Sequence, residues 1–423
     1  MNIAVISLFS LLVVVVISCV NQRLNPGLLA LLAASTIGLF LGGMSIGSIT
    51  ALFPSNLFIL LVSMSLVFGT AHHNGTLDKI TQRALFLIKG QQKLLPILIF
   101  ILAFLFSALG PGNIVATAIL APMAMILAKK HRVSELLVAI MLCTGANAGA
   151  FSPIAPTGII AIGLMEKMLI SKDLIWIVFG ASAVLQSISA LFAYSLFLFR
   201  SHKRNRLQTI KNADKFKIIV EPFINEQKIT LGLIVILLVG VTIFKLPLIL
   251  VSLAVALVMF GLKLADEEVI LKTLPWSTIL MVSGIAILIG LMEKTGGLDL
   301  ATDFIASTAS PKIISGLLAL VSGAVSAYSS SSGVVLPAFM PLIPGLAQKM
   351  NIPDMIPMVI AVAVGSHMVD VSPLSTLGAL SLAAVDDKSV RDRMFKMLMI
   401  WGMAMSVVAG LLAFVFLDVL IYI

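Results

Sequence analysis

The residues best suited to holding an ion lie where long apolar segments are interrupted. Four interruptions, at 110–113, 145–157, 329–333 and 365–376, combine glycine, proline, serine, threonine or asparagine within apolar sequence. We expect a helix to restart after each one, at about Ile114, Gly158, Val334 and Leu377. Each restart would point free N–H groups and the positive end of a helix dipole at the interruption. An anion can be held there without Arg or Lys, and His367 is the one basic residue in the four segments.

A substrate site is therefore predicted at these breaks. Its candidate residues are Gly110, Pro111, Gly112, Asn113, Asn147, Thr157, Ser329, Ser330, Ser331, Ser332, His367 and Thr376. Simpler roles stay open: Asn113 would cap a helix, the glycines and Pro111 would permit a turn, and the serine run would be a linker.

Ion coupling is predicted at the same breaks, where carbonyls left free at the preceding helix ends suit Na⁺. The candidates are Asn113, Gly145, Ser152, Ser332, Asp370 and Ser372, with Na⁺ expected at the tips of the broken segments. Asp370 is the one carboxylate within a predicted mid-membrane break, and such residues are functional by default. It either couples Na⁺ or H⁺ or is a structural partner of His367.

The interruptions recur in both halves of the sequence. Pro54 recurs as Pro275, and Asn113 corresponds to Ser332 at nearly the same separation along the chain. A third landmark recurs at a matching separation: Gly145, Ser152, Pro153 and Gly158 become Gly365, Ser372, Pro373 and Gly378. In so apolar a chain, such a duplication indicates a secondary transporter whose two halves build one central site.

The composition indicates a membrane protein: 60% of residues are hydrophobic, 11% are charged, and the mean hydropathy is +1.13. Apolar runs long enough to span a bilayer lie at 3–20, 26–43, 54–71, 174–199, 229–244, 247–262, 276–292 and 394–423. Cys19 and Cys143 both lie in apolar sequence and predict no disulfide framework. The first run lacks a basic flank and has a counterpart at 229–244, so we interpret it as a retained helix rather than a signal peptide.

The net charge of +9 is a topology signal rather than a nucleic-acid patch. With the N-terminus outside and five spans plus one re-entrant hairpin per half, 22 of the 28 Lys and Arg residues face the cytoplasm. Segments 94–128 and 311–346 are the predicted hairpins, each broken in its middle. Because five spans is an odd number, the hairpins enter from opposite faces and the repeats are inverted. We therefore expect repeats at 1–200 and 229–423, a cytoplasmic linker at 201–228, and both termini outside the inner membrane.

The breaks resemble those of the ion transporter superfamily, whose divalent anion/sodium symporters carry Ser-Asn-Thr at each hairpin tip. Gly112-Asn113-Ile114 and Ser331-Ser332-Gly333 lie on the two motifs, and only Asn113 and Ser331 match residue for residue. The opening is similar to the malonate/dicarboxylate carrier family, over Met1-Asn2-Ile3-Ala4, Asn25-Pro26-Gly27-Leu28-Leu29 and Gly42-Gly43.

This resemblance implies an all-α elevator transporter for small di- or polycarboxylate anions, coupled to Na⁺ or H⁺. It implies a scaffold from 1–93 and 229–310, which also forms a homodimer, and a moving transport domain from 94–200 and 311–423. No phosphate loop, paired metal-ligand spacing or nucleophile–base pair points to an enzyme, and no cofactor is expected beyond the coupling ion.

Two alternatives stay open. One is the large membrane subunit of a binding-protein-dependent tripartite dicarboxylate transporter. The other is a cation/proton antiporter, which would be expected to bury more carboxylates than Asp370 alone.

Overall fold

The computed structural model describes residues 2–20, 24–86, 92–131, 133–204 and 222–419. These residues are helical and contain no strand, as predicted. The predicted cytoplasmic residues Arg23, Lys89 and Arg132 and most of the 201–228 linker lie outside them. The helices of the first half are α1 (Ile3–Val20), α2 (Pro26–Thr36), η1 (Ile37–Leu41), α3 (Ile46–Thr50), α4 (Ser55–His73), α5 (Thr76–Phe86), η2 (Gln92–Leu94), α6 (Leu95–Ala108), α7 (Gly112–Lys130), α8 (Glu135–Gly149), α9 (Pro156–Lys167), η3 (Lys172–Leu174) and α10 (Ile175–Arg204).

The second half repeats this order of helices. Its elements are α11 (Asn225–Thr242), α12 (Leu248–Gly261), α13 (Glu267–Thr273), α14 (Trp276–Thr295), α15 (Gly297–Thr308), α16 (Ile314–Ser326), η5 (Ser331–Val335), α17 (Leu336–Phe339), η6 (Met340–Leu342), α18 (Ile343–Met350), α19 (Ile356–Met368), α20 (Thr376–Ala383), α21 (Lys388–Ala413) and η7 (Phe414–Val419). Thus α1 to α6 correspond to α11 to α16, α7 to the run from η5 to α18, and α8 to α10 correspond to α19 to α21.

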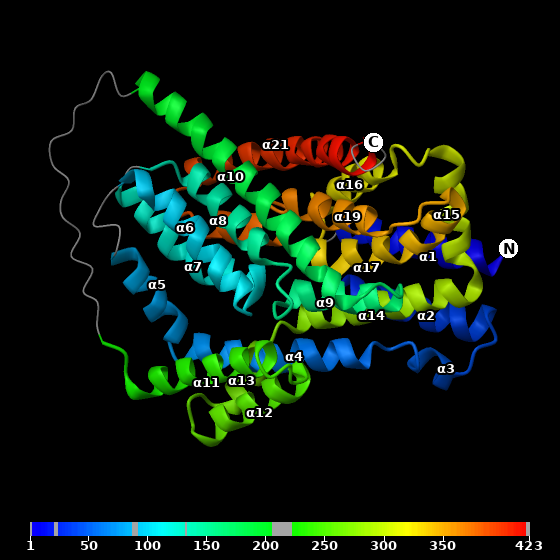
Figure 1. Cartoon of the computed structure of the whole chain (residues 1–423), viewed down its shortest axis with the longest axis horizontal. Coiled ribbons are helices and arrows are strands. Elements are labelled where there is room, and N and C mark those ends of the chain that lie inside the picture. Colours follow the sequence, from blue (N-terminus) through cyan, green and yellow to red (C-terminus); the bar gives the residue numbers. More distant parts are fainter. Residues whose placement is uncertain (1, 21–23, 87–91, 132, 205–221, 420–423) are drawn as a thin grey trace.

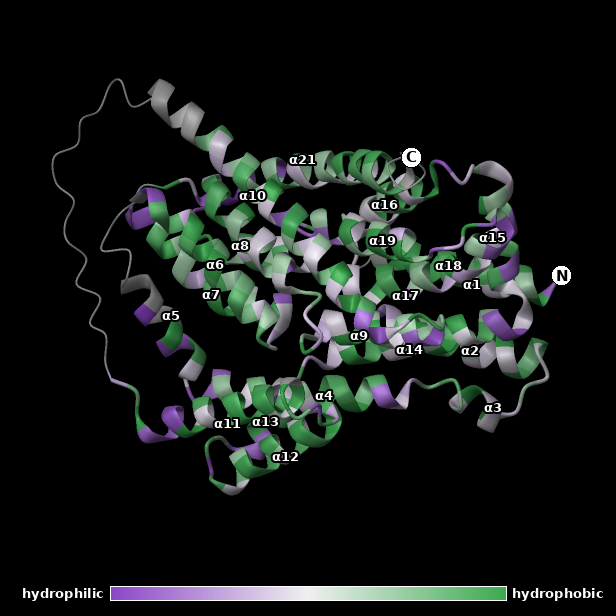
Figure 2. Ribbon diagram, viewed as in Figure 1, coloured by the Kyte–Doolittle hydropathy of each residue, from purple (hydrophilic) through white to green (hydrophobic). Residues whose placement is uncertain are grey.

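The chain is a polytopic membrane protein. Six of the described helices are long and apolar enough to cross a membrane, and seven shorter ones are apolar. The eight predicted unbroken spans coincide with α1, α2–η1, α4, α10, α11, α12, α14 and α21–η7. Figure 2 shows hydrophobic residues along most of the helices, with hydrophilic residues gathered mainly at the two ends of the molecule.

Two hairpins approach the centre of the molecule from opposite ends (Figure 1). In the first, α6 packs against α7 after a short turn at 109–111, and in the second, α16 is followed by the shorter helical pieces η5 to α18. Proline explains these pieces, since Pro337, Pro341 and Pro344 each lie in the first turn of one of them. Proline lacks a backbone N–H, so it is tolerated best at the first turn of a helix.

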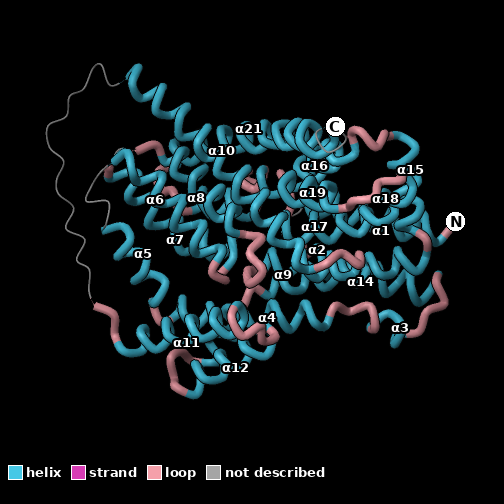
Figure 3. Tube along the Cα trace, viewed as in Figure 1, coloured by secondary structure: helices cyan, strands magenta, loops and turns pink. Residues whose placement is uncertain are grey.

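The two predicted breaks in spanning helices are shorter than expected. The α8 helix continues to Gly149 and α9 begins at Pro156, so Gly145 and Asn147 are helical rather than unwound. Likewise α19 continues to Met368, which places His367 in its last turn and Asp370 in the break. Gly145 and Gly365 are tolerated inside α8 and α19 because they allow close packing against neighbouring helices. The sequence alone did not show this packing. Figure 3 shows loop segments within the helical bundle at these positions.

Helices from the two halves also pack against each other at small residues. The α2 helix packs against α14, where a Cβ added at Gly27 or Gly284 would overlap the backbone of the other helix. The Asn25 side chain caps α2 by accepting from Gly27 N (2.8 Å) and donates to the Ser277 carbonyl in α14 (2.8 Å). The corresponding pair, α12 and α4, is joined by the hydroxyls of Ser252 and Ser63 (2.7 Å). Small residues are typical of close helix packing in membranes.

One end of the molecule collects residues from three separate helices. The charges of Lys129 at the end of α7 and of Asp387 and Arg393 at the start of α21 all act on Glu135, which begins α8. Hydrogen bonds from the Ser389 hydroxyl and from the backbone N–H groups of Val390 and Ser389 hold the pKa of Asp387 below its usual range. This clustering brings Lys129 and Arg393 to the same end of the molecule.

Membrane sidedness can be tested at one residue from each hairpin. Lys129 near the end of α7 and Gln348 in α18 are both exposed and come from equivalent helices. If the repeats are inverted, a membrane-impermeant maleimide added to intact cells will label Gln348→Cys, and Lys129→Cys only after permeabilisation. The parent chain, which carries Cys19 and the fully buried Cys143, is the control and measures the background labelling of both. Labelling of both variants from the same side would contradict the inverted topology.

Candidate functional site

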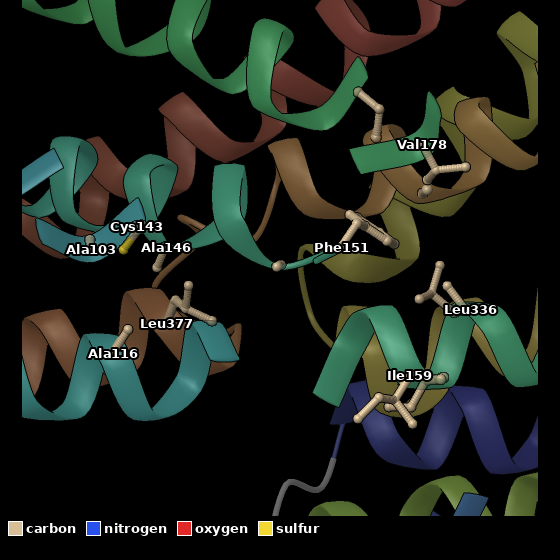
Figure 4. Packing of buried hydrophobic residues seen from close by; sticks show 14 of the residues in the cluster. Ala103, Ala116, Cys143, Ala146, Phe151, Ile159, Val178, Leu336 and Leu377 are labelled. Carbon is tan, nitrogen blue, oxygen red and sulfur yellow. The ribbon is translucent and has the colours of Figure 1, made fainter. Parts of the chain in front are cut away.

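The site is built where the second part of each broken helix meets the hairpin of the other half. The α20 helix, which follows the second break, packs against α7, and α9, which follows the first break, contacts α17. Figure 4 shows Leu377 at the start of α20 close to Ala116 of α7 and Ala146 of α8. Both breaks and both hairpins therefore belong to one central region.

The duplicated glycine motif has the same structural reason in both halves. A Cβ at Gly145 would overlap the carbonyl oxygen of Phe100 in α6, and one at Gly365 would overlap that of Ala319 in α16. A Cβ at Gly158 or Gly378 would overlap the carbonyl oxygen of Ser152 or Ser372, respectively. The first pair seats the broken helix against its hairpin, and the second lets the chain fold back at the break. Gly145, predicted for ion coupling, thus has a packing role.

The turn of the first hairpin needs glycine for its backbone. Gly110 and Gly112 have φ of 132° and 79°, a region that side chains rarely adopt. A Cβ at Gly110 would overlap the ring of Phe68 in α4, and one at Gly112 would come within 2.7 Å of Pro156 Cδ at the start of α9. The turn role left open for Gly110 and Gly112 is therefore present, and Pro111 lies buried between them.

Asn113 and Asn147 connect the first hairpin to the second half. Asn147 Nδ2 donates to the carbonyl oxygen of His367 (2.9 Å), which orients the amide so that Asn147 Oδ1 accepts from Asn113 Nδ2 (2.9 Å). Asn113 Oδ1 in turn accepts from Ile114 N (3.0 Å) and Thr157 Oγ1 (3.5 Å). Asn113 lies within the first turn of α7, whose N-cap is Pro111, so it is not the N-cap residue that the alternative expected, although its side chain accepts from a first-turn N–H. All three predicted side chains, of Asn113, Asn147 and Thr157, are buried.

The second hairpin uses its serines in a similar way. Ser326 Oγ at the end of α16 donates to the carbonyl oxygen of Ser366 (2.7 Å). Ser331 Oγ lies 2.6 Å from Ser326 Oγ and 3.2 Å from the same carbonyl. Ser330 Oγ accepts from Gly333 N (3.1 Å) and so caps η5. Ser329 and Ser332 are buried at the same tip.

The two hairpins thus bond to consecutive carbonyls in the last turn of α19. The first reaches the His367 carbonyl through Asn147, and the second reaches the Ser366 carbonyl directly. Two sets of hydrogen bonds, one from each tip, therefore meet at adjacent peptide groups of α19, although Asn113 and Ser331 belong to different halves of the sequence. A displacement of either tip would therefore strain or break hydrogen bonds to the last turn of α19.

Asp370 lies in the second break and is 2% exposed. Its Oδ1 is buried without a hydrogen-bond partner among the described residues. Ser375 Oγ donates to the backbone carbonyl of Asp370 (2.7 Å), and the side chains of Ser375 and Ser331 lie near the carboxylate. None of the ion pairs in the described part of the chain involves Asp370, and the Asp370 and His367 side chains are not bonded to each other in this conformation, although Asp370 N donates to the His367 carbonyl oxygen (3.4 Å).

The remaining candidates occupy separate places around the second break. Ser372 Oγ donates to the carbonyl oxygen of Ala327 at the second hairpin (2.6 Å), tying the break to the tip. Ser152 is buried in the first break, and Thr376 is partly exposed at the start of α20. The starts of α7, α9 and α20 carry no side-chain cap from their N-cap residues.

The sequence did not point to Ser326 and Ser366, which belong to the bonds at the second tip, or to Phe151, whose ring packs against that of His367. One signal was available: the separation that relates Asn113 to Ser332 also relates Ser107 to Ser326, a repeated hydroxyl one turn before the tip. Ser107 Oγ is buried without a partner among the described residues. Across the part of the chain that the structure describes, no group of three or more His, Cys, Asp or Glu side chains is placed to hold a metal ion.

The N-terminal part of the chain matches a known family. Residues 1–150 match the family model described as "Dicarboxylate carrier protein MatC N-terminus". This match confirms the resemblance to the malonate/dicarboxylate carrier family over α1 to α8, which include the first hairpin and Asn147. No curated protein matches the chain.

Proposed function

We propose that this chain is a secondary transporter that carries a small di- or polycarboxylate anion across the inner membrane. The observation that carries the proposal is the two sets of hydrogen bonds, one from each of two opposed hairpin tips, that meet at the end of α19. The match of residues 1–150 to a dicarboxylate carrier family supports the substrate class.

In this proposal, helix starts and neutral polar groups hold the anion. The N-cap residues of α9 and α20 accept no bond from the helix start, at the start of α7 the Asn113 side chain accepts from Ile114 N, and neither break contains Lys or Arg. A helix start favours an anion through its N–H groups and its dipole. Asn113, Thr157 and the serines of the second tip would complete the site, and the dicarboxylate would lie between the two tips.

Transport would follow an elevator mechanism. The scaffold would comprise 1–93 and 229–310 and form a homodimer, and the hairpins, broken helices and last helix of each half would move together. Both tips touch the proposed scaffold: Gly110 abuts Phe68 in α4, and a Cβ at Gly333 would overlap the sulfur of Met281 in α14. Structures of inward and outward states should show both hairpins displaced against 26–43. An unchanged position of the hairpins would exclude the mechanism.

The substrate and the driving ion can be identified in one assay. Purified protein in proteoliposomes is offered labelled malonate, succinate or citrate, with Na⁺ and pH gradients imposed separately. We expect concentrative uptake of at least one of these anions under one of the two gradients. Absence of both uptake and exchange of every anion tested, compared with protein-free liposomes, would contradict the proposal.

Asp370→Asn is expected to separate binding from coupling. The carboxylate is buried and its Oδ1 lacks a partner among the described residues, so it offers a charged oxygen ligand for Na⁺ or an acceptor for H⁺. An amide has an oxygen in the same place but lacks the negative charge and the basicity. If Asp370 couples the ion, the variant will bind substrate but will not respond to the ion gradient that drives the parent. Concentrative uptake with unchanged ion dependence would end the coupling role of Asp370.

A further inference from the structure

One nitrogen at the centre of the molecule is unpartnered within the described part of the chain. The His367 ring is completely buried, and its Nε2 has no hydrogen-bond partner among the described residues. Phe151, from the break in the other half, packs against the ring at 61° with the centroids 4.6 Å apart. An unpartnered buried polar atom is costly unless something else binds it.

The protonation of the other ring nitrogen follows from its partners. Nδ1 lies 2.9 Å from the carbonyl oxygen of Ala363 and 3.0 Å from Ser366 Oγ. A carbonyl can only accept, so Nδ1 carries the hydrogen, and the Ser366 hydroxyl, which donates to Val362 O (2.8 Å), is free to accept as well. In this tautomer Nε2 is a lone-pair acceptor. Nε2 therefore lacks a hydrogen-bond donor among the described residues.

The equivalent residue in the first half shows the contrast. Asn147 uses both ends of its amide, accepting from Asn113 and donating to the His367 carbonyl. Its counterpart His367 leaves Nε2 open, and three residues later Asp370 Oδ1 is a second open acceptor. At this pair of equivalent positions, the side chain of Asn147 is bonded at both ends and that of His367 is not.

We propose that His367 carries one proton across the membrane with each substrate anion, bound at Nε2. This inference rests on the proposed function. A proton from the entry side adds to the Nε2 lone pair and converts the neutral imidazole to imidazolium, whose new N–H then donates to a substrate carboxylate. The proton leaves to water on the exit side as the anion departs. An anion within hydrogen-bonding distance favours the charged imidazolium.

A nitrogen acceptor distinguishes H⁺ from Na⁺. Na⁺ prefers oxygen ligands, which the hydroxyls, carbonyls and Asp370 supply, whereas an imidazole nitrogen binds a proton. Burial alone disfavours the charged ring, and an anion bound beside it offsets this cost. The other ionisable groups near this position are Asp370 in the same break and Cys143 in α8. The neighbouring α16 and the run from η5 to α17 contain no ionisable residue.

The test measures how far a pH gradient drives uptake. With the membrane potential clamped at zero, one cotransported proton allows a pH difference of one unit to support roughly tenfold accumulation. His367→Asn, which places the first-half residue at this position, cannot take the proton and should lower the accumulation ratio about tenfold. His73→Asn, at the exposed end of α4, is the matched control and should keep the parent ratio. An unchanged ratio in His367→Asn would overturn the proposal.

A second measurement uses the unmodified protein and does not depend on the variant folding. Succinate is added to purified protein in weak buffer at a pH where succinate is fully ionised, and protons taken from solution are counted with an indicator dye. We expect about one proton per succinate bound, and no proton uptake on binding would overturn the proposal. Exchange of labelled succinate across vesicles without any gradient tests the proposed transport function separately. Exchange without proton uptake would remove only the inference about His367.

Discussion

Asn113→Ala should weaken substrate binding roughly tenfold to a hundredfold. Its amide links the first hairpin to Asn147, and its removal leaves Asn147 Oδ1 buried without its donor. A hydrogen bond to a charged group contributes about 1.5–3 kcal/mol, and each 1.4 kcal/mol corresponds to a factor of about ten in the dissociation constant. If the amide also contacts the anion, as proposed, its loss falls in this range.

The measurement is equilibrium binding of the anion identified by the uptake assay to purified protein. Asn56→Ala is a suitable control, because Asn56 is an exposed asparagine near the start of α4. Thermal unfolding of both variants shows whether Asn113→Ala also loosens the hydrogen bonds at this tip. Unaltered affinity in Asn113→Ala would end the assignment of this tip to the substrate site.

Gly158→Ala and Gly378→Ala should both abolish transport and strongly destabilise the protein. In each case the added Cβ would overlap the carbonyl oxygen of a serine earlier in the break, Ser152 or Ser372, so the break cannot keep its conformation. Overpacking in a well-packed interior costs about 1–3 kcal/mol, and backbone atoms relax less readily than side chains. We therefore expect a loss at or above the upper end of this range.

Gly163→Ala separates this effect from a general effect of substitution in the same helix. Gly163 also lies in α9, but a Cβ there would meet only Leu57 side-chain atoms, at 3.9 Å and beyond. Alanine is a better helix former than glycine, so this variant should be at least as stable as the parent. Thermal unfolding in detergent and uptake in proteoliposomes measure both properties. Parent-like stability and uptake in Gly158→Ala would show that the break tolerates rearrangement.

The sequence alone determined the class of fold and the position of its breaks. A bilayer requires apolar runs of sufficient length, so the eight unbroken spans could be located from hydropathy alone. The repeated spacing from Gly145 to Gly158 could be recognised as a landmark because the same backbone contacts recur in both halves and only glycine fits them. The polar tips at Asn113 and Ser331 stood out because polar residues are costly within apolar segments.

Only the tertiary structure decided how these parts are connected. It extended α8 and α19 past Gly145 and Gly365, and it joined Asn147 to the carbonyl of His367 in the other half of the chain. It also left the side chains of Asp370 and His367 unpaired with each other among the described residues, although their spacing in the sequence had suggested them as partners. Hydrogen bonds to a backbone carbonyl do not depend on the side chain of the residue that supplies it. The carbonyls at the end of α19 therefore became visible as the meeting point of the two hairpins only after both halves were folded together.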